Sequence, residues 1–312
     1  MSKPDLTNLA RYRKAMLNNC VFAPVYPKVL RIEATNHCNA KCTFCPRDEM
    51  TRPMGIMSVE LFKKILDDCP ACMIRSIHLH NFGESLLDKQ LATKIAYAKA
   101  TRGIEELVLI TNGELLTEKT ATSLMNAGLD SISISMDANG KESYESTRLG
   151  LHYDKLVANV EGLIALRNRM NSKLKIALTF VYRDNDSELM AFIDRWKPLV
   201  DETRGTYLHN WAVIQSPKPH VSSICSRPWK TMTVLWDGRV SLCCIDLDGT
   251  VILGDVTKQS MKEVWTGLQY ARARLEHLQE TGPKICLTCD LPCHDSLDWI
   301  PEIFETIGKD IP

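Results

Sequence analysis

The cysteines of this chain stand in two groups whose spacing suits metal binding. The chain has twelve of them, and none lies between Met73 and Ile224. Closely spaced thiols bind zinc or iron–sulfur clusters in a reducing compartment and form disulfides in an oxidising one. The first 17 residues lack the apolar core of a signal peptide, and no stretch approaches the roughly 20 apolar residues of a membrane span. We therefore expect a cytoplasmic protein whose thiols serve metal or redox chemistry.

The first group is a CxxxCxxC run, Cys38, Cys42 and Cys45, directly after an expected strand over residues 29–35. Three thiolates from one short loop can hold three irons of a [4Fe–4S] cube and leave the fourth iron open to a small molecule. With His37 as a fourth ligand, the same residues would also suit a zinc knuckle. In either case the metal would lie at the carboxyl end of a strand, where barrel active sites are found.

Alternating elements must position this loop. Short β-branched runs alternate with segments of helical periodicity, which is typical of βα units around parallel strands. The expected strands are 29–35, 76–80, 107–111, 131–136, 174–182 and 206–213. The expected helices are 58–69, 87–99, 117–126, 156–170 and 187–199. Six units are too few for a closed eight-fold barrel, so we predict an α/β fold with a partial, TIM-like (β/α)6 barrel.

The barrel is expected to be the middle of three parts. We predict an N-terminal helical extension over residues 1–28, the barrel over 29–213, and a small C-terminal domain over 214–312. In the last part, residues 232–236 and 239–244 flank the pair Asp237-Gly238, which is typical of a tight β-hairpin. A short strand over 250–253 and a helical stretch over 260–279 follow.

The charge of the chain is balanced, with 38 Lys and Arg against 38 Asp and Glu. A net charge of zero gives no long-range attraction to nucleic acid or to an anionic membrane. We see no basic patch in the sequence, and we expect neither partner.

The first cysteine group resembles the signature of the radical S-adenosylmethionine (SAM) superfamily. That signature has the same spacing with an aromatic residue before the third cysteine, here Phe44. In the family the three cysteines hold a [4Fe–4S] cluster, and the methionine amino and carboxylate groups of SAM chelate its open iron. The resemblance extends over about residues 30–213. It implies that Cys38, Cys42 and Cys45 bind the cluster and that SAM is a cofactor.

Polar residues after the next strands continue the resemblance. Asn81-Phe82-Gly83-Glu84 stands where the family has a Gly-Gly-Glu turn that receives the methionine amino group, with Phe82 replacing the first glycine. Thr111-Asn112-Gly113 is similar to the family's Thr-Asn-Gly, and Ser135, Asp137 and Arg148 to its Ser-x-Asp and Arg pattern. The resemblance implies SAM contacts from Phe44, Gly83, Glu84, Asn112, Ser135 and Arg148. Taken singly, each is also an ordinary polar or small residue at a strand end.

The second cysteine group resembles the auxiliary-cluster extension called SPASM in its long form and twitch in its short form. Two further [4Fe–4S] clusters would need about seven or eight cysteines, and this part of the chain has six. The resemblance therefore implies one auxiliary [4Fe–4S] cluster, on Cys225, Cys243, Cys286 and Cys289, with Cys293 as an alternative ligand. A structural zinc ribbon is the other interpretation of the same residues.

Three further features have weaker chemical signals. Adjacent strand residues point to opposite faces, so Cys244 would point away from the auxiliary cluster and could donate a hydrogen atom to a substrate radical. A small buried residue is the commoner role of such a cysteine. His78 and His80 share one strand face and are candidate substrate contacts if that face is the barrel interior. A hydrogen-bonded core position is the commoner role for at least one of them. Cys69 and Cys72 form a CxxC at a helix end without the surroundings of a redox motif.

The resemblance implies an enzyme that cleaves SAM to a 5′-deoxyadenosyl radical, which removes a hydrogen atom from a substrate C–H bond. The outcome would be oxidation (dehydrogenation) or epimerisation. We expect a sugar or aminocyclitol-type small molecule, because only about 28 residues precede the first strand and peptide maturases often carry an extra peptide-binding domain. A maturase of a ribosomally made peptide is the alternative, and a non-catalytic zinc or iron–sulfur protein is the alternative of another class. An electron donor such as flavodoxin or ferredoxin is an expected partner.

Overall fold

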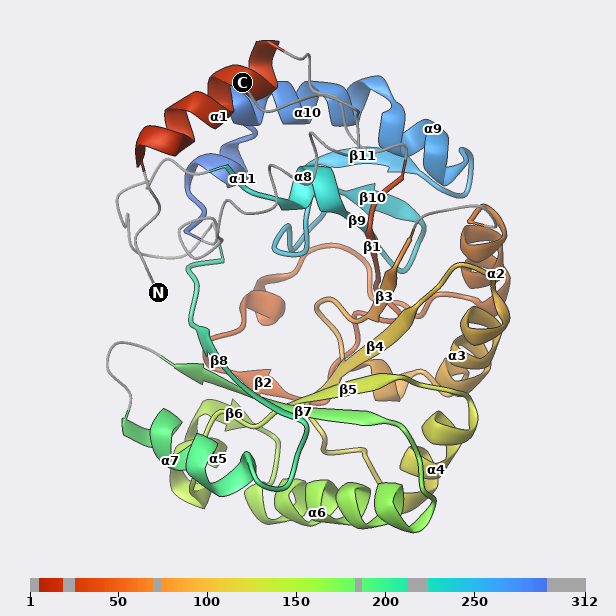
Figure 1. Cartoon of the computed structure of the whole chain (residues 1–312), viewed down its shortest axis with the longest axis vertical. Helices are drawn as coiled ribbons and strands as arrows, with labels where there is room; N and C mark the ends of the chain where they lie inside the picture. The colour runs from red at the N-terminus through yellow and green to blue at the C-terminus, as the bar shows by residue number, and fades with distance from the viewer. Residues whose placement is uncertain (1–5, 19–25, 70–73, 183–186, 212–223, 291–312) are drawn as a thin grey trace.

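The computed structural model describes residues 6–18, 26–69, 74–182, 187–211 and 224–290. A curved parallel sheet with helices along its outer face makes up most of this structure (Figure 1). Its six parallel strands are β1 (Val29–Ile32), β3 (Ser76–Leu79), β4 (Glu106–Thr111), β5 (Ser131–Ser135), β7 (Lys175–Tyr182) and β8 (Glu202–Tyr207), in that order across the sheet. The predicted partial barrel of α/β class is therefore confirmed.

The outer helices are close to their expected positions. They are α2 (Val59–Asp67), α3 (Leu91–Ala100), α4 (Glu118–Asn126), α6 (Tyr153–Arg169) and α7 (Ser187–Trp196). Helix α2 illustrates why they form: the Ser58 hydroxyl accepts a hydrogen bond from the backbone N–H of Leu61 at 3.0 Å and caps the helix. Phe62 and Ile65 of α2 then pack in the core with the outward-facing Leu30 of β1.

The opposite face of the strands carries many polar side chains and points into the barrel. Arg31 of β1 pairs in register with His78 of β3, and His78 pairs with Val108 of β4. Since side chains alternate along a strand, Arg31 and His78 face inward while Leu30 and Ile77 are fully buried towards the helices. Bulky branched residues are usual inside a closed barrel. A polar inner face instead leaves room for a polar ligand.

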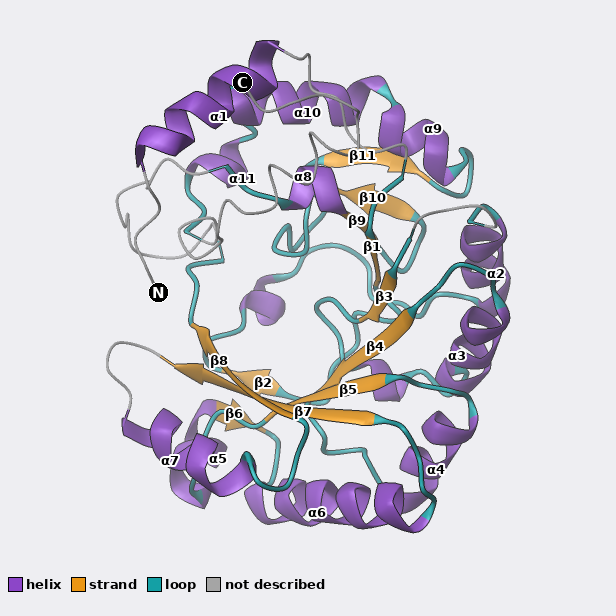
Figure 2. Cartoon of the chain, viewed as in Figure 1, coloured by secondary structure: helices purple, strands orange, loops and turns teal. Residues whose placement is uncertain are grey.

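The C-terminal hairpin continues the barrel sheet. Strand β9 (Thr231–Val234) lies parallel to β1, and β10 (Arg239–Ser241) and β11 (Ile252–Asp255) follow antiparallel, which makes one nine-stranded sheet (Figure 2). The expected helix over 260–279 is divided into α9 (Met261–Thr266) and α10 (Leu268–Leu278) because Gly267 between them has an extended ψ of 168°. The short helices α8 (Arg227–Lys230) and α11 (Lys284–Leu287) complete this part.

Helix α1 (Leu6–Asn18) falls within the expected N-terminal helical extension. It lies beside α10, and Arg13 pairs with Glu280, just after α10, at 2.8 Å. Several other elements were not predicted. Helix α5 (Lys141–Thr147) and the 3-10 turns η1 (Pro46–Glu49) and η2 (Ser85–Leu87) lie in the loops. Strands β2 (Lys41–Cys42) and β6 (Arg148–Leu149) form a separate antiparallel pair. Among the described residues, no helix is long and apolar enough to cross a membrane.

Candidate active site

The strands of the barrel end at a cavity of about 250 Å³. We call it the first cavity. It is lined by the three cysteines of the CxxxCxxC run, Cys38, Cys42 and Cys45, and by all six residues for which the sequence predicts cofactor contacts: Phe44, Gly83, Glu84, Asn112, Ser135 and Arg148. Residues far apart in sequence thus surround one space.

The three thiols suit an iron–sulfur cluster chemically. Each is free of a disulfide, and burial raises the pKa of each above its ordinary value. A buried thiol ionises when a cation or a metal compensates its charge, and iron coordination does so outright. Within the described part of the chain, no three His, Cys, Asp or Glu side chains converge on a single ion site. The thiols instead line a shared cavity from one loop.

Arg148 is brought to this loop by the pairing of β2 with β6, in which Cys42 is the register partner of Arg148. Nη1 of Arg148 lies 3.7 Å from the Cys42 sulfur, and its guanidinium lies 5.3 Å from the centre of the Phe44 ring. Nε of Arg148 also donates to the Asp137 carboxylate at 2.7 Å. Although burial opposes the charge, Asp137 raises the pKa of Arg148 above its ordinary value. Arg148 is therefore a fixed cation at the edge of the first cavity.

Glu84 links the turns that follow β3 and β4. Its carboxylate accepts hydrogen bonds from the Thr111 hydroxyl at 2.8 Å, the Asn112 backbone N–H at 2.7 Å and the Leu86 backbone N–H at 3.0 Å. Burial raises the pKa of Glu84 against the effect of these bonds. A carboxylate has about four acceptor positions, so one stays open for an ammonium donor.

Gly83 is required by the close approach of two loops. A Cβ at this position would lie 2.1 Å from the carbonyl oxygen of Thr35. The adjacent Glu84 N–H donates to the carbonyl of His37 at 2.8 Å. On the other side, the side-chain amide of Asn112 donates to Asn39 at 2.9 Å. The turns after β1, β3 and β4 are therefore held together around the cysteine loop.

Two site residues were missed because the last strand was misplaced. The strand expected over 206–213 is β8, which spans Glu202–Tyr207. Residues His209 and Trp211 then follow its carboxyl end and line the first cavity. Nε1 of Trp211 donates to the carbonyl of Phe44 at 2.8 Å, and its ring lies 5.7 Å from that of Phe82. A correct strand end would have revealed both residues.

His78 of β3 and His80, the first residue after that strand, face inward, which is the condition set for substrate contacts. His80 lines the first cavity, and its ring lies 5.8 Å from that of His78. Burial, followed by the charge of Arg31, lowers the pKa of His78 to about 4 and that of His80 well below its ordinary value. Both rings are therefore neutral near pH 7. Cys69 is instead a core residue, and Cys72 lies outside the described residues.

The second cysteine group also gathers around one space. Cys225, Cys243, Cys286 and Cys289 line a second, smaller cavity together with His277 and Arg227. None of the four thiols is in a disulfide, and burial raises the pKa of Cys286 and that of Cys243 above their ordinary value. The backbone N–H of Cys225 donates to Nε2 of His277 at 2.9 Å, a contact that the sequence did not reveal. Cys293, the alternative ligand, lies outside the described residues.

Cys244 is positioned by a turn and not by a strand. Strand β10 ends at Ser241, so the argument from strand alternation is wrong, yet the two neighbouring thiols still diverge. Cys243 lines the second cavity, whereas Cys244 contacts Arg31 and is not among the described residues that line the first cavity. Burial opposes its ionisation, but the charges of Arg227 and Arg31 lower the pKa of Cys244.

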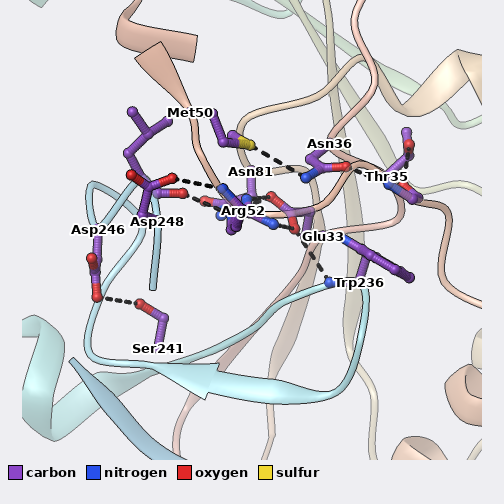
Figure 3. Close-up of polar contacts among 12 residues, drawn as sticks. Glu33, Thr35, Asn36, Met50, Arg52, Asn81, Trp236, Ser241, Asp246 and Asp248 are labelled. Carbon is purple, nitrogen blue, oxygen red and sulfur yellow. Dashed lines mark hydrogen bonds and ion pairs between the residues drawn. The ribbon is translucent and has the colours of Figure 1, made fainter. Parts of the chain in front are cut away.

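A buried polar network joins the barrel to this turn (Figure 3). Arg52 forms a bidentate ion pair with Glu33, with N–O distances of 2.7 and 2.5 Å. The Nε of Arg52 donates to the carbonyl of Leu247 at 2.7 Å. Glu33 also accepts from the backbone N–H of Trp236 at 3.2 Å, at the start of the β9–β10 turn. The loop after the first cysteine group is thereby attached to the C-terminal hairpin.

Hydrogen bonds to the Asp246 side chain stabilise the turn between β10 and β11. Its buried carboxylate accepts from the Ser241 hydroxyl at 3.0 Å and from the Val251 N–H at 2.9 Å. It also accepts from the N–H and hydroxyl of Thr250, at 2.8 and 2.9 Å. Four bonds to one carboxylate define the path of the segment that carries Cys243 and Cys244.

Comparison with protein families gives two matches. The model of the radical SAM superfamily matches residues 32–195, and the model of the SPASM iron–sulfur cluster-binding domain matches residues 225–290.

Among curated proteins, the chain is 22% identical over 266 residues to the S-adenosyl-L-methionine-dependent 2-deoxy-scyllo-inosamine dehydrogenase of Niallia circulans, a match that covers 84% of this chain and 92% of that protein. It is 26% identical over 165 residues to the GTP 3′,8-cyclase of Chlorobaculum tepidum. That match covers 53% of this chain and 48% of the cyclase, so the chain spans about half the length of that relative.

Solved structures share the fold. BtrN in complex with AdoMet and 2-DOIA matches with a TM-score of 0.59 and 21% identity, over 84% of this chain and 92% of BtrN. Streptococcus suis SuiB bound to S-adenosylmethionine matches with a TM-score of 0.67 and 15% identity, over 92% of this chain and 76% of SuiB. Native anSMEcpe with bound AdoMet matches with a TM-score of 0.64 and 16% identity, over 90% of this chain and 95% of anSMEcpe.

Proposed function

Since the chain belongs to the radical SAM superfamily and carries a SPASM domain, we propose that Cys38, Cys42 and Cys45 hold the [4Fe–4S] cluster at which SAM is cleaved. A [4Fe–4S] cluster held by these cysteines would supply the electron for cleavage of SAM to methionine and a 5′-deoxyadenosyl radical, and with it the removal of a hydrogen atom from a substrate C–H bond. The observation that carries the proposal is the first cavity, where these thiols meet the six residues expected to contact SAM.

The chain's own residues bind and orient the cofactor. We propose that Arg148 pairs with the methionine carboxylate of SAM, because Asp137 holds its guanidinium as a fixed cation beside Cys42. The open acceptor position on Glu84 would receive the methionine ammonium. Phe44 and Trp211 cover the cavity with aromatic surface, which would exclude water from a reactive radical. Such positioning is the main contribution of a protein to cofactor chemistry.

We further propose that Cys225, Cys243, Cys286 and Cys289 hold a single auxiliary cluster and that the reaction is an oxidation. The position of Cys244 supports oxidation over epimerisation: it contacts Arg31 instead of lining the first cavity, so it is poorly placed to return a hydrogen atom there. The dehydrogenase name of the Niallia circulans relative agrees. An electron donor such as flavodoxin or ferredoxin would reduce the first cluster.

The proposed substrate is a small polar molecule of the sugar or aminocyclitol type. The inward-facing Arg31, His78, His80 and Ser135 support this, because apolar side chains would be expected around an apolar ligand. A peptide substrate is the second candidate, since the fold also matches Streptococcus suis SuiB bound to its precursor peptide SuiA, at a TM-score of 0.63.

The test is the formation of 5′-deoxyadenosine by anaerobically reconstituted protein with dithionite and SAM, measured by chromatography. We expect the nucleoside from the wild type and none from Cys42→Ala. Cys69→Ala is the matched control, because this cysteine is buried in the core beside the Ile65 carbonyl. If the wild type with a full iron complement forms no 5′-deoxyadenosine, the chain is a non-catalytic member of the family.

Oxidation and epimerisation are distinguished by solvent deuterium once a substrate is found. A thiol exchanges its hydrogen with solvent, so epimerisation in D₂O places deuterium on the substrate carbon. Dehydrogenation leaves none there. We expect an oxidised product without deuterium, and an isomeric product carrying one deuterium would contradict the proposal.

A further inference from the structure

Two consecutive residues after β8, Asn210 and Trp211, each hold a segment that carries candidate cluster ligands. Trp211 holds the first of these segments. Its Nε1–H donates to the carbonyl of Phe44 at 2.8 Å, and Phe44 lies between Cys42 and Cys45 in the chain. Trp211 also lines the first cavity. This residue therefore fixes the backbone of the first cysteine loop at the edge of the cavity.

Asn210 holds the segment that carries Cys289. Its side-chain amide donates to the carbonyl of Thr288 at 2.7 Å. Its backbone N–H is shared between the two carboxylate oxygens of Asp290, at 3.0 and 3.1 Å, and Asp290 is buried. Thr288 and Asp290 are the two neighbours of Cys289, which lines the second cavity. Asn210 and Trp211 together therefore connect the two cysteine groups.

The backbone of Trp211 has a conformation that its neighbours must impose. Its φ is 54°, in the left-handed region that bulky residues rarely adopt. Such a residue persists where surrounding contacts fix it, and these residues are common at ligand-binding sites. Here the Nδ1 of His209 accepts from the Trp211 N–H at 3.2 Å, and the two rings lie 4.0 Å apart. The ring of Phe82 lies 5.7 Å away on the wall of the first cavity.

We propose that Asn210 and Trp211 are positioning residues that couple the two cysteine sites. An auxiliary cluster would fix Cys289, and the bonds from Asn210 to both neighbours of Cys289 would then hold Trp211 at the first cavity. SAM would bind more tightly as a result, because the residues around it are already in place. The effect is reciprocal, so SAM would strengthen binding of the auxiliary cluster by the same factor. The inference rests on the proposed function, which places SAM in the first cavity and a cluster in the second.

A role limited to the path of the chain leads to a different expectation. Loss of the auxiliary cluster would then leave SAM binding unchanged, or its effect would be independent of Trp211. The affinity for SAM must therefore be measured with and without the auxiliary cluster, in the wild type and in a variant of Trp211. Such a double-mutant cycle isolates the coupling between the two changes.

The measurement is the dissociation constant of SAM, obtained by anaerobic titration calorimetry on the reconstituted full chain without a reductant, so that no turnover occurs. We expect the variant with Cys225→Ala and Cys286→Ala to bind SAM about fivefold more weakly or worse, the lower end of usual coupling between sites. Trp211→Phe loses one hydrogen bond and should cost about fivefold. In the Trp211→Phe background, loss of the auxiliary cluster should change the constant by less than about twofold.

Asn210→Ala gives an independent test, because Asn210 is not among the described residues that line the first cavity. It should still weaken SAM binding by about twofold or more, as expected for the loss of its bond to Thr288. Trp236→Phe is the matched control for Trp211→Phe. It removes an indole N–H that donates to the carbonyl of Pro53 at 3.1 Å, and Trp236 lines neither cavity in the described structure. It should bind SAM as the wild type does.

Iron analysis and electron paramagnetic resonance show which clusters each protein holds, so a loss of affinity is not mistaken for a loss of the first cluster. The inference is overturned if SAM affinity is unchanged after loss of the auxiliary cluster, if that loss and Trp211→Phe have additive effects, if Asn210→Ala binds SAM like the wild type, or if Trp236→Phe weakens binding as much as Trp211→Phe. A wild type that binds no SAM, or that holds no auxiliary cluster, contradicts the proposed function itself and the inference with it.

Discussion

At the scale of single residues, the site depends on positions where very little space is available. Gly83 is the clearest case, since a Cβ there would meet the Thr35 carbonyl oxygen at 2.1 Å and the His37 carbonyl oxygen at 2.8 Å. Both neighbours are backbone atoms of the segment that leads into the cysteine loop. They cannot move aside as a flexible side chain would.

We therefore expect Gly83→Ala to destabilise the protein by about 3 kcal/mol, the upper part of the usual range for an overpacked site. Denaturant titration under anaerobic conditions measures this. Iron content should fall as well, because the loop with Cys38 must shift. Gly162→Ala is the control: its Cβ meets nothing within 4 Å, and alanine in a helix interior is expected to stabilise by about 0.5 kcal/mol or more. Equal stability of the two variants would contradict this explanation.

The resemblance to the radical SAM superfamily implied the nine residues around the first cavity, because its motifs lie at strand ends or within the cysteine loop. The placement of Arg227 is different. It belongs to no motif, and α8 and β9 bring it to the side of β1, where it acts electrostatically on Arg31. Long-range pairing of this kind cannot be read from one sequence. The same reason applies to the contact between Cys225 and His277.

At the scale of elements, the Glu33–Arg52 pair joins three segments: the end of β1, the loop after the first cysteine group, and the turn between β10 and β11. Asp248 of that turn accepts from the backbone N–H groups of Thr51 and Arg52, at 2.7 and 3.1 Å. The side chains of the ion pair are almost completely buried. Removing one partner would leave the other charge buried and unpaired.

We expect Arg52→Met to cost about 3 to 5 kcal/mol in the free energy of unfolding, which is the usual effect of breaking a buried ion pair. The double variant Glu33→Met with Arg52→Met should recover a substantial part of this loss, because no uncompensated charge is left. Anaerobic denaturant titrations of the four proteins give the coupling energy directly. Additive losses would show that the pair stabilises the protein through packing alone.

The elements also show where hydrophobic periodicity predicts secondary structure wrongly. Strand β8 was misplaced because its residues, Glu202 to Tyr207, are mostly exposed and lack an apolar alternation. It is the edge strand of the sheet, so one side of it has no neighbour to demand apolar residues. Helix α2, with its Ser58 cap and buried Phe62 and Ile65, was predictable because local and tertiary signals agree.

At the scale of the whole molecule, the two thiol groups line separate cavities of one connected sheet. We expect the reconstituted wild type to contain about eight irons per chain, as two [4Fe–4S] clusters require, and a variant with Cys225→Ala and Cys286→Ala to contain about four. Iron and sulfide analysis measures both. About four irons in the wild type would mean that the second thiol group holds no cluster, whereas bound zinc in that group would favour a structural site.

The pairing of β9 with β1 also determines what happens when the chain is divided. Without the C-terminal hairpin, β1 would become an open strand whose row of N–H and C=O groups faces solvent beside the first cysteine loop. Such an edge recruits strands from other molecules and promotes aggregation. The C-terminal hairpin therefore covers the edge of the barrel sheet beside the first cysteine loop, and we expect the barrel to aggregate when it is produced without this hairpin.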